Sequence, residues 1–209
     1  DVIHGSTGDD VIGGGGSARG DQLFGHAGDD VFVVAAAPGE KTGATTVDGG
    51  AGRDTVRGTD GDDVIMLEDF AIDRGVEVLD AGAGDDVLTG NKPWGQHHID
   101  LRGIEVHGLE RIQVGDKDDV IHGSTGDDVI EGGGGGDVMS GGAGADGFVV
   151  DLGDGGRDRI LDFTPGEDHL HVDAAAAAAL SPNLAADNLA PRALFAYGGW
   201  KFHEQAGNE

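Results

Sequence analysis

Large apolar residues recur along the chain at intervals of nine, each two places after an aspartate. The stretch from Gly123 to Val149 reads GSTGDDVIE, GGGGGDVMS, GGAGADGFV. Each of these units has glycine at its fourth place, aspartate at its sixth and a large apolar residue at its eighth. The residues around the eighth place suffice only for a short strand whose middle side chain points inward. Because such a strand cannot stand alone, the pattern predicts short strands stacked on copies of themselves and joined by glycine-rich turns.

The same unit recurs through most of the chain. Ten aspartates stand two places before an apolar residue: Asp10, Asp21, Asp30, Asp54, Asp63, Asp86, Asp119, Asp128, Asp137 and Asp146. A flexible glycine–aspartate linker is the alternative, but it has no reason to place an apolar residue at every such position. Some units depart from the pattern, with Arg19 or Lys117 at the fourth place or Ala81 at the first. Since Lys117 puts a positive charge in its turn, we expect Asp119 to bind a cation less well than Asp128.

The residue types in the turns point to calcium. Glycines at the first and fourth places allow a tight turn and let backbone carbonyls approach an ion closely. The sixth-place aspartate adds a carboxylate, and Ca2+ binds roughly six to eight oxygens of both kinds. The expected metal site consists of the ten aspartates together with Gly5, Gly8, Gly25, Gly28, Gly49, Gly52, Gly58, Gly61, Gly123, Gly126, Gly132, Gly135, Gly141 and Gly144.

The composition indicates that folding of these repeats depends on a cation. A net charge of −27 with 5% aromatic residues is typical of a disordered chain. Glycine is abundant, at 42 residues, but a period of nine rather than three excludes collagen. The repeat and the composition agree if folding depends on a cation that neutralises the acidic turns. The acidity also argues against nucleic acid and anionic lipid surfaces as partners.

The residue types support neither cysteine-based chemistry nor a membrane-spanning protein. The chain has no cysteine, which excludes disulfides, zinc–thiolate sites and thiol nucleophiles. It shows no signal peptide and no apolar run near the length of a membrane span. The absence of cysteine says little about the compartment, since calcium can replace disulfides in extracellular proteins.

The unit resembles the calcium-binding nonapeptide G-G-x-G-x-D-x-U-x, with U apolar, of the RTX (hemolysin-type) family. The resemblance implies an all-β fold, a right-handed parallel β-roll in two or three stacks, with non-repeat insertions. Two units would make one coil turn, with calcium ions between turns at both edges. Units two apart would then stack, with Ile130 on Phe148 in one sheet and Ile121 on Met139 in the other. The family also implies a secreted or cell-surface protein exported by type I secretion machinery.

Non-repeat segments divide the chain. We expect a first stack over residues 1–34, degenerate units with insertions over 35–118, a second stack with capping strands over 119–173, and a flanking segment over 174–209. The chain starts within a unit, which indicates part of a longer protein. A short helix over 174–180, capped by Asp173, is expected near the end. Glu77 and Glu110 stand at the aspartate place of two further units, which we interpret as restarting a coil.

The segment DRILDFTPGEDHLHV resembles the strand pair that closes serralysin-type RTX domains, written D-x-I-x-D-F-x-x-G-x-D-x-I. A solenoid needs such a cap to cover its last apolar layer. The resemblance therefore implies that this segment covers the layer at Phe148. The matching residues are Asp158, Asp162, Phe163, Gly166, Asp168 and Leu170.

Other chemistry has less support. The histidines suggest zinc, but H-E-x-x-H is absent, and His97 and His98 are adjacent, so on a strand they point apart; surface histidines are expected. No G-x-S-x-G motif supports a hydrolase. Trp94 and Trp200 are expected to pack rather than to stack on a sugar. The fifth-place aspartates are expected to face solvent: Asp9, Asp29, Asp62, Asp85 and Asp127.

The sequence thus predicts a calcium-binding module without a catalytic constellation of its own. Two other classes stay open. One is the non-catalytic C-terminal module of an extracellular enzyme, such as a protease, lipase or polysaccharide epimerase. The other is a structural segment of an RTX adhesin or surface-layer protein, whose carbohydrate or cell-surface partner the sequence does not identify. The sequence upstream of Asp1 would separate them.

Overall fold

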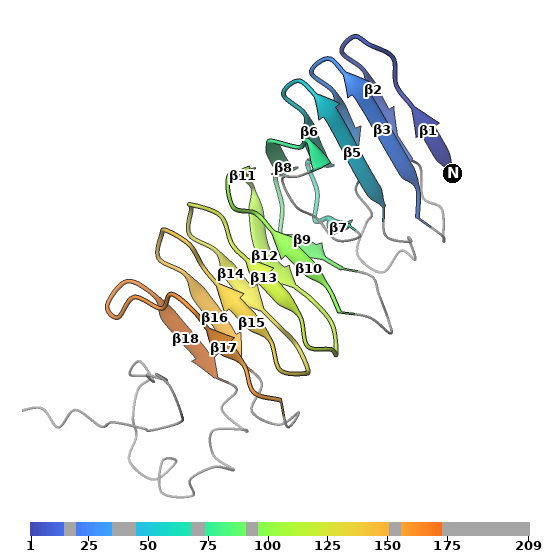
Figure 1. The fold of residues 1–209 in the computed structure, drawn as a ribbon. Helices are drawn as coiled ribbons and strands as arrows, with labels where there is room; N and C mark the ends of the chain where they lie inside the picture. The colour runs from blue at the N-terminus through green and yellow to red at the C-terminus, as the bar shows by residue number, and fades with distance from the viewer. Residues whose placement is uncertain (15–19, 35–44, 68–73, 91–95, 151–155, 173–209) are drawn as a thin grey trace, which may run out of the picture.

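The computed structural model describes residues 1–14, 20–34, 45–67, 74–90, 96–150 and 156–172. Within these ranges the chain is all β, without α-helix, and the strands pair in parallel along one elongated stack (Figure 1). The expected helix over 174–180 lies outside the described residues, as do Arg19, Trp94 and Trp200.

The described part of the chain forms eighteen strands, none longer than six residues, as a nine-residue unit requires. They are β1 (Val2–His4), β2 (Val11–Gly13), β3 (Gln22–Ala27), β4 (Val31–Val33), β5 (Thr46–Ala51), β6 (Thr55–Thr59), β7 (Val64–Met66), β8 (Val78–Gly82), β9 (Asp86–Thr89), β10 (His98–Asp100), β11 (Glu105–His107), β12 (Leu109–Gln113), β13 (Val120–His122), β14 (Val129–Glu131), β15 (Val138–Ser140), β16 (Gly147–Val150), β17 (Arg159–Ile160) and β18 (His169–Val172).

Strands alternate between two faces of a solenoid. One face holds the sheets β1-β3-β5 and β7-β9-β12-β14-β16-β18, which a single bridge between Thr45 and Leu67 connects. The other face holds β2-β4-β6-β8-β11 and β10-β13-β15-β17. The predicted parallel β-roll is therefore confirmed.

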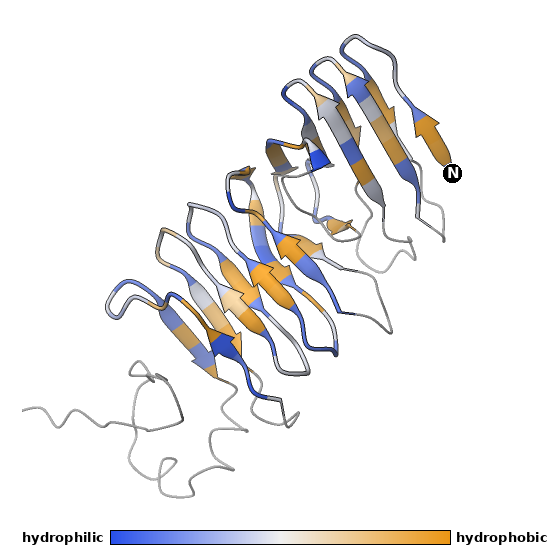
Figure 2. Ribbon diagram, in the orientation of Figure 1, coloured by the Kyte–Doolittle hydropathy of each residue, from blue (hydrophilic) through white to orange (hydrophobic). Residues whose placement is uncertain are grey.

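The register follows the nine-residue unit. Ile130 pairs with Phe148 and Ile121 pairs with Met139, so units two apart stack as expected. Burial alternates along the short strands, with the middle residue of β2 and of β14 more buried than its neighbours, because successive side chains point to opposite faces. Figure 2 shows that hydrophobic residues are concentrated on the strands. Every eighth-place apolar side chain is buried: Ile12, Leu23, Phe32, Val56, Ile65, Leu88, Ile121, Ile130, Met139 and Phe148.

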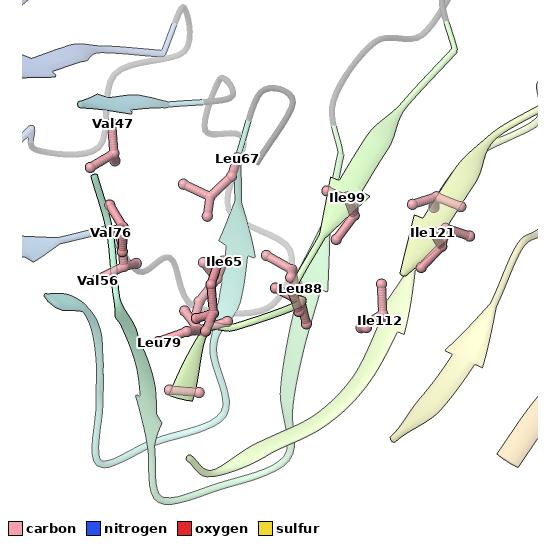
Figure 3. Close-up of a cluster of buried hydrophobic side chains, with 14 of the residues drawn as sticks. Val47, Val56, Ile65, Leu67, Val76, Leu79, Leu88, Ile99, Ile112 and Ile121 are labelled. Carbon is pink, nitrogen blue, oxygen red and sulfur yellow. The ribbon is translucent and has the colours of Figure 1, made fainter. Parts of the chain in front are cut away.

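One hydrophobic core runs between the faces, with buried members from Ile12 to Val150. Figure 3 shows part of this core, with side chains from Val47 to Ile121 labelled. On the second face, one sheet ends at β11 and the next begins at β10. Ile99, Leu101 and Ile104 are buried at this junction and fill the core there. On the first face, the junction between the two sheets lies at a different level, between β5 and β7. Because the two faces break at different levels, the core continues through both junctions.

The C-terminal segment adds another turn to the roll. β17 pairs with β15 and β18 pairs with β16, which sets Leu170 beside Phe148. The rings of Phe148 and Phe163 lie 6.1 Å apart between centroids. Asp162 accepts two backbone N–H groups of the preceding turn, each at 3.0 Å. The segment thus covers the apolar layer at Phe148, and its carboxylates bind the roll.

Hydrogen exchange in saturating calcium is expected to be slower at Ile130 and Phe148 than at Ile3 and Ile12. The reason is that β14 and β16 pair with a strand on each side, whereas β1 and β2 end their sheets. Val11, beside Ile12, is also 78% exposed. Strands with fewer buried contacts open at lower free energy. Amide exchange followed by NMR measures the ranking, and the reverse order would contradict it.

Candidate metal centre

The sixth-place aspartates lie at the two edges of the solenoid, where the chain turns from one face to the other. Nine of the ten are buried, and Asp10 is half-buried. Burying a carboxylate is unfavourable unless it is hydrogen-bonded, paired or bound to a metal. The partners of these carboxylates therefore decide what the edges can hold.

In most of these carboxylates, one oxygen ties successive turns together. Oδ1 of Asp30 accepts the backbone N–H of Asp10 at 2.8 Å, and Oδ1 of Asp54 accepts that of Asp30 at 2.8 Å. We call such a row an aspartate ladder. The same bond joins the pairs Asp63–Asp86, Asp119–Asp137 and Asp128–Asp146. The structure thus brings together residues that lie 18 to 24 positions apart in the sequence.

Residues outside the ten predicted aspartates continue the ladders. Glu77, Asp158 and Asp168 each accept the N–H of the aspartate one turn earlier. His97 takes the aspartate place of another turn, and its N–H donates to Oδ1 of Asp119 at 2.5 Å. Each of these residues stands two places before an apolar residue. That spacing is the signal that finds His97, which a search for acidic residues misses.

Glu110 does not take the aspartate place. The register of β12 is irregular between Leu109 and Arg111, and Glu110 lies exposed between them. The interpretation of the two glutamates as substitutes for aspartate is therefore confirmed for Glu77 and wrong for Glu110.

The second oxygen of several ladder carboxylates is orphaned. Oδ2 is buried and accepts no hydrogen bond from the described residues in Asp30, Asp54, Asp86 and Asp119. Leaving a buried polar atom without a partner costs about 1–3 kcal/mol, and more for a charged group. Orphaned oxygens at equivalent positions of separate turns indicate that a cation completes these turns.

A backbone carbonyl faces the orphaned oxygen across the first-place glycine. A Cβ on Gly25 would lie 2.2 Å from Oδ2 of Asp30 and 2.5 Å from the carbonyl oxygen of Gly49. A Cβ on Gly49 would lie 2.6 Å from Oδ2 of Asp54 and 1.8 Å from the carbonyl oxygen of Gly75. Only glycine fits there, and a carboxylate of one turn converges with a carbonyl of the next. Oxygens of these two kinds are the ligands that Ca2+ prefers, so the residues fit this ion.

Zinc suits the edges less well. Among the described residues, no group of three histidine, aspartate or glutamate side chains is arranged to hold a metal by itself. A site here therefore depends on backbone carbonyls, which suit calcium. His98 and His107 are exposed as expected, but His97 is buried, with Nδ1 3.1 Å from Oδ1 of Asp119. The expectation of a surface histidine is wrong for His97.

Burial raises the pKa of ladder carboxylates. It raises the pKa of Asp128 to about 6, and repulsion from Asp146 acts in the same direction. Burial is also the main cause of the raised pKa values of Asp54 and Asp86. The half-buried Asp10 differs, because the backbone amide of Ser6 lowers its pKa. Without a cation, Asp54, Asp86 and Asp128 therefore hold protons more tightly than in the unfolded chain.

The fifth-place aspartates are exposed, as expected, but they also make a hydrogen bond. Oδ1 of Asp29 accepts the backbone N–H of Arg53 at 2.8 Å, and Oδ1 of Asp127 accepts that of Ala145 at 2.8 Å. In this outer row the earlier turn accepts, whereas in the aspartate ladders the earlier turn donates. The nonapeptide pattern leaves the fifth place variable, so it carries no signal of this row.

The fold and its edges define a class of protein, a β-solenoid whose glycine–aspartate turns hold cations between coils. The family model of the RTX calcium-binding nonapeptide repeat matches residues 1–18, 16–35, 41–70, 73–92 and 114–148. These matches cover more than half of the chain, and the chain belongs to this family, whose repeats bind several Ca2+ ions. No curated protein matches the chain. Among the described residues, none forms a helix long and apolar enough to cross a membrane.

The variant Asp137→Ala is expected to weaken calcium binding by at least about tenfold, which is about 1.4 kcal/mol per site. This carboxylate is buried and ties its turn to the N–H of Asp119. Asp127→Ala is the matched control and should have much less effect, because Asp127 is exposed. Calcium titration calorimetry measures both variants. Equal losses would show that the fifth and sixth places contribute alike.

In excess chelator, the far-UV circular dichroism of a β-sheet is expected to grow as the pH falls from 7 to 5. The pKa of Asp128 is about 6 in the fold against 3.8 as its ordinary value. The folded state therefore binds the proton more tightly, and its stability rises as the pH falls through 6. Asp128→Asn should reduce this gain, since it removes one such group. A β signal that weakens over this range would contradict the prediction.

Proposed function

We propose that this chain is the folding switch of a secreted protein: it stays unfolded during type I export and forms the β-roll when Ca2+ binds outside the cell. The observation that carries the proposal is the set of buried carboxylate oxygens without a protein partner, in Asp30, Asp54, Asp86 and Asp119. A roll without cations would keep these charges desolvated and stacked on one another, which is unfavourable. An ion between turns offsets both costs.

The charge of the whole chain supports the coupling of folding to calcium. Acidic residues outnumber basic ones by 40 to 13, and only 5% of residues are aromatic. Such a chain buries little apolar surface against strong self-repulsion. Because the sites exist only in the folded state, the free energy of ion binding becomes free energy of folding.

Calcium concentration then supplies the direction of the switch. Extracellular calcium modules bind at roughly 0.1–1 mM. Sites of that affinity stay empty inside a cell and fill outside it. An unfolded, acidic chain can pass through a narrow export channel, and folding on the far side prevents its return.

Within the parent protein, the closing turn favours the role of a C-terminal module of an extracellular enzyme. β17 and β18 extend the roll, and Phe163 packs on Phe148, so the apolar layer there is covered. A structural segment of an adhesin or surface-layer protein is the other candidate. The roll itself is a structural calcium-binding module in either case.

Calcium-dependent folding is tested on the whole chain by far-UV circular dichroism and small-angle scattering. In excess chelator the spectrum should be that of a disordered chain, and millimolar Ca2+ should produce a β spectrum and compaction. Mg2+ is the control and should substitute poorly, because it demands a tighter octahedral shell and keeps its waters. A fully folded roll in excess chelator would contradict the proposal.

A further inference from the structure

The turns of the ladders are of two kinds that the nonapeptide pattern does not distinguish. In the first kind, a second-place serine or threonine satisfies the carboxylate of its own turn. Ser124 donates to Oδ2 of Asp128 from its backbone N–H at 2.7 Å and from Oγ at 3.0 Å. Both bonds recur in the pairs Ser6–Asp10 and Thr59–Asp63, and the N–H bond recurs in the pair Thr164–Asp168. We call these closed turns.

In the second kind, the second-place residue lies in the left-handed region of φ. Serine and threonine avoid this region, whereas glycine adopts it freely. The orphaned oxygens of Asp30, Asp54 and Asp86 all belong to such turns. We call these open turns; their left-handed second-place residues are His26, Gly50, Gly82, Gly133 and Gly142, with φ from 78° to 107°.

In the closed turns of Ser6, Thr59 and Ser124, no described turn packs on the fourth-place glycine. In an open turn the fourth-place glycine packs on the turn before it, so that a Cβ on Gly144 would lie 2.4 Å from the carbonyl oxygen of Gly126. In closed turns this contact is missing: within 4 Å of a Cβ there, Gly8 meets no described atom and Gly126 meets only Oγ of Ser124. Among the described residues, Ser124 thus marks the first turn of its ladder.

The ladder that runs through Asp119 starts with His97 instead. A Cβ on Gly90 would lie 2.0 Å from Cδ2 of His97, and one on Gly115 would lie 3.3 Å from its Cε1. The imidazole therefore lies beside Gly90, as a carboxylate oxygen lies beside the first-place glycine in other turns.

We infer that the second-place residue decides which turns bind calcium. Open turns leave Oδ2 to the ion, whereas closed turns are ion-free, because a residue of the same turn already donates to that oxygen. Two donors reach it at Asp10, Asp63 and Asp128, and one reaches it at Asp168. The closed turns are those of Asp10, Asp63, Asp128 and Asp168.

This inference rests on the proposed function and deepens it. It excludes Ca2+ from the closed turn of Asp128, although Lys117 made Asp128 the expected better site than Asp119. An ion-free first turn holds its shape with its own hydrogen bonds, so it offers a formed surface on which the next turn and its ion assemble.

Native mass spectrometry of the whole chain in saturating calcium counts the bound ions. Asp86→Asn should lower the count by at least one, because the orphaned Oδ2 of Asp86 belongs to the open turn of Gly82. Asp63→Asn should leave the count unchanged, although Asp63 holds the same place one turn earlier and is also buried. Circular dichroism of each variant in calcium controls for folding. An equal loss in the two variants would overturn the inference.

A second pair of variants decides the question without touching a carboxylate. Ser124→Gly should raise the ion count by one, because glycine can adopt the left-handed conformation and release Oδ2 of Asp128. Ser124→Ala should leave the count unchanged, because alanine keeps the backbone conformation and its N–H donor. An unchanged count in Ser124→Gly would overturn the inference and leave the proposed function intact. An unmodified chain that binds no calcium would overturn both.

Discussion

The structure depends on a buried carboxylate that uses its two oxygens differently. Oδ1 accepts the N–H of the turn before and so sets the spacing and register of the stack, as in the bond from Asp10 to Asp30. Oδ2 is left for a cation in the open turns. Because each unit contributes only one large apolar side chain to the core, the edges must supply much of the cohesion between turns.

The different partners of Oδ1 and Oδ2 explain why glycine is needed at the first and second places of a unit. The first-place glycine makes room where a carboxylate and a carbonyl converge, as at Gly25. The second-place glycine supplies the left-handed turn that keeps the N–H away from the carboxylate. Serine or threonine at that place reverses the outcome, so one residue separates a turn that needs a cation from a turn that satisfies itself.

The buried carboxylates also link folding to the calcium concentration around the protein. Buried carboxylates with raised pKa values favour either a proton or a metal ion, and at neutral pH the metal ion is the one available outside a cell. Folding then responds to calcium concentration through many similar sites along a quasi-one-dimensional stack, in which each turn contacts only its neighbours.

The sequence by itself determined the period, the stacking and the inward side chains. Ile130 on Phe148 and Ile121 on Met139 follow from a nine-residue unit and two units to a turn, because the signal is local and repeated. The spacing of an acid two places before an apolar residue also located Glu77 correctly. It misplaced Glu110, because a local irregularity in β12 leaves that side chain exposed.

Only the tertiary structure shows which partner each carboxylate oxygen has. The bond from Ser124 to Asp128, the burial of His97 against Asp119 and the outer row through Asp29 are absent from the repeat pattern. Most of these bonds join residues that are 18 to 24 positions apart and meet only when one turn lies on the next. The sequence could therefore name the ligating residue types, while the conformation of each turn decided which carboxylates keep an oxygen free for calcium and stacking brought those turns together.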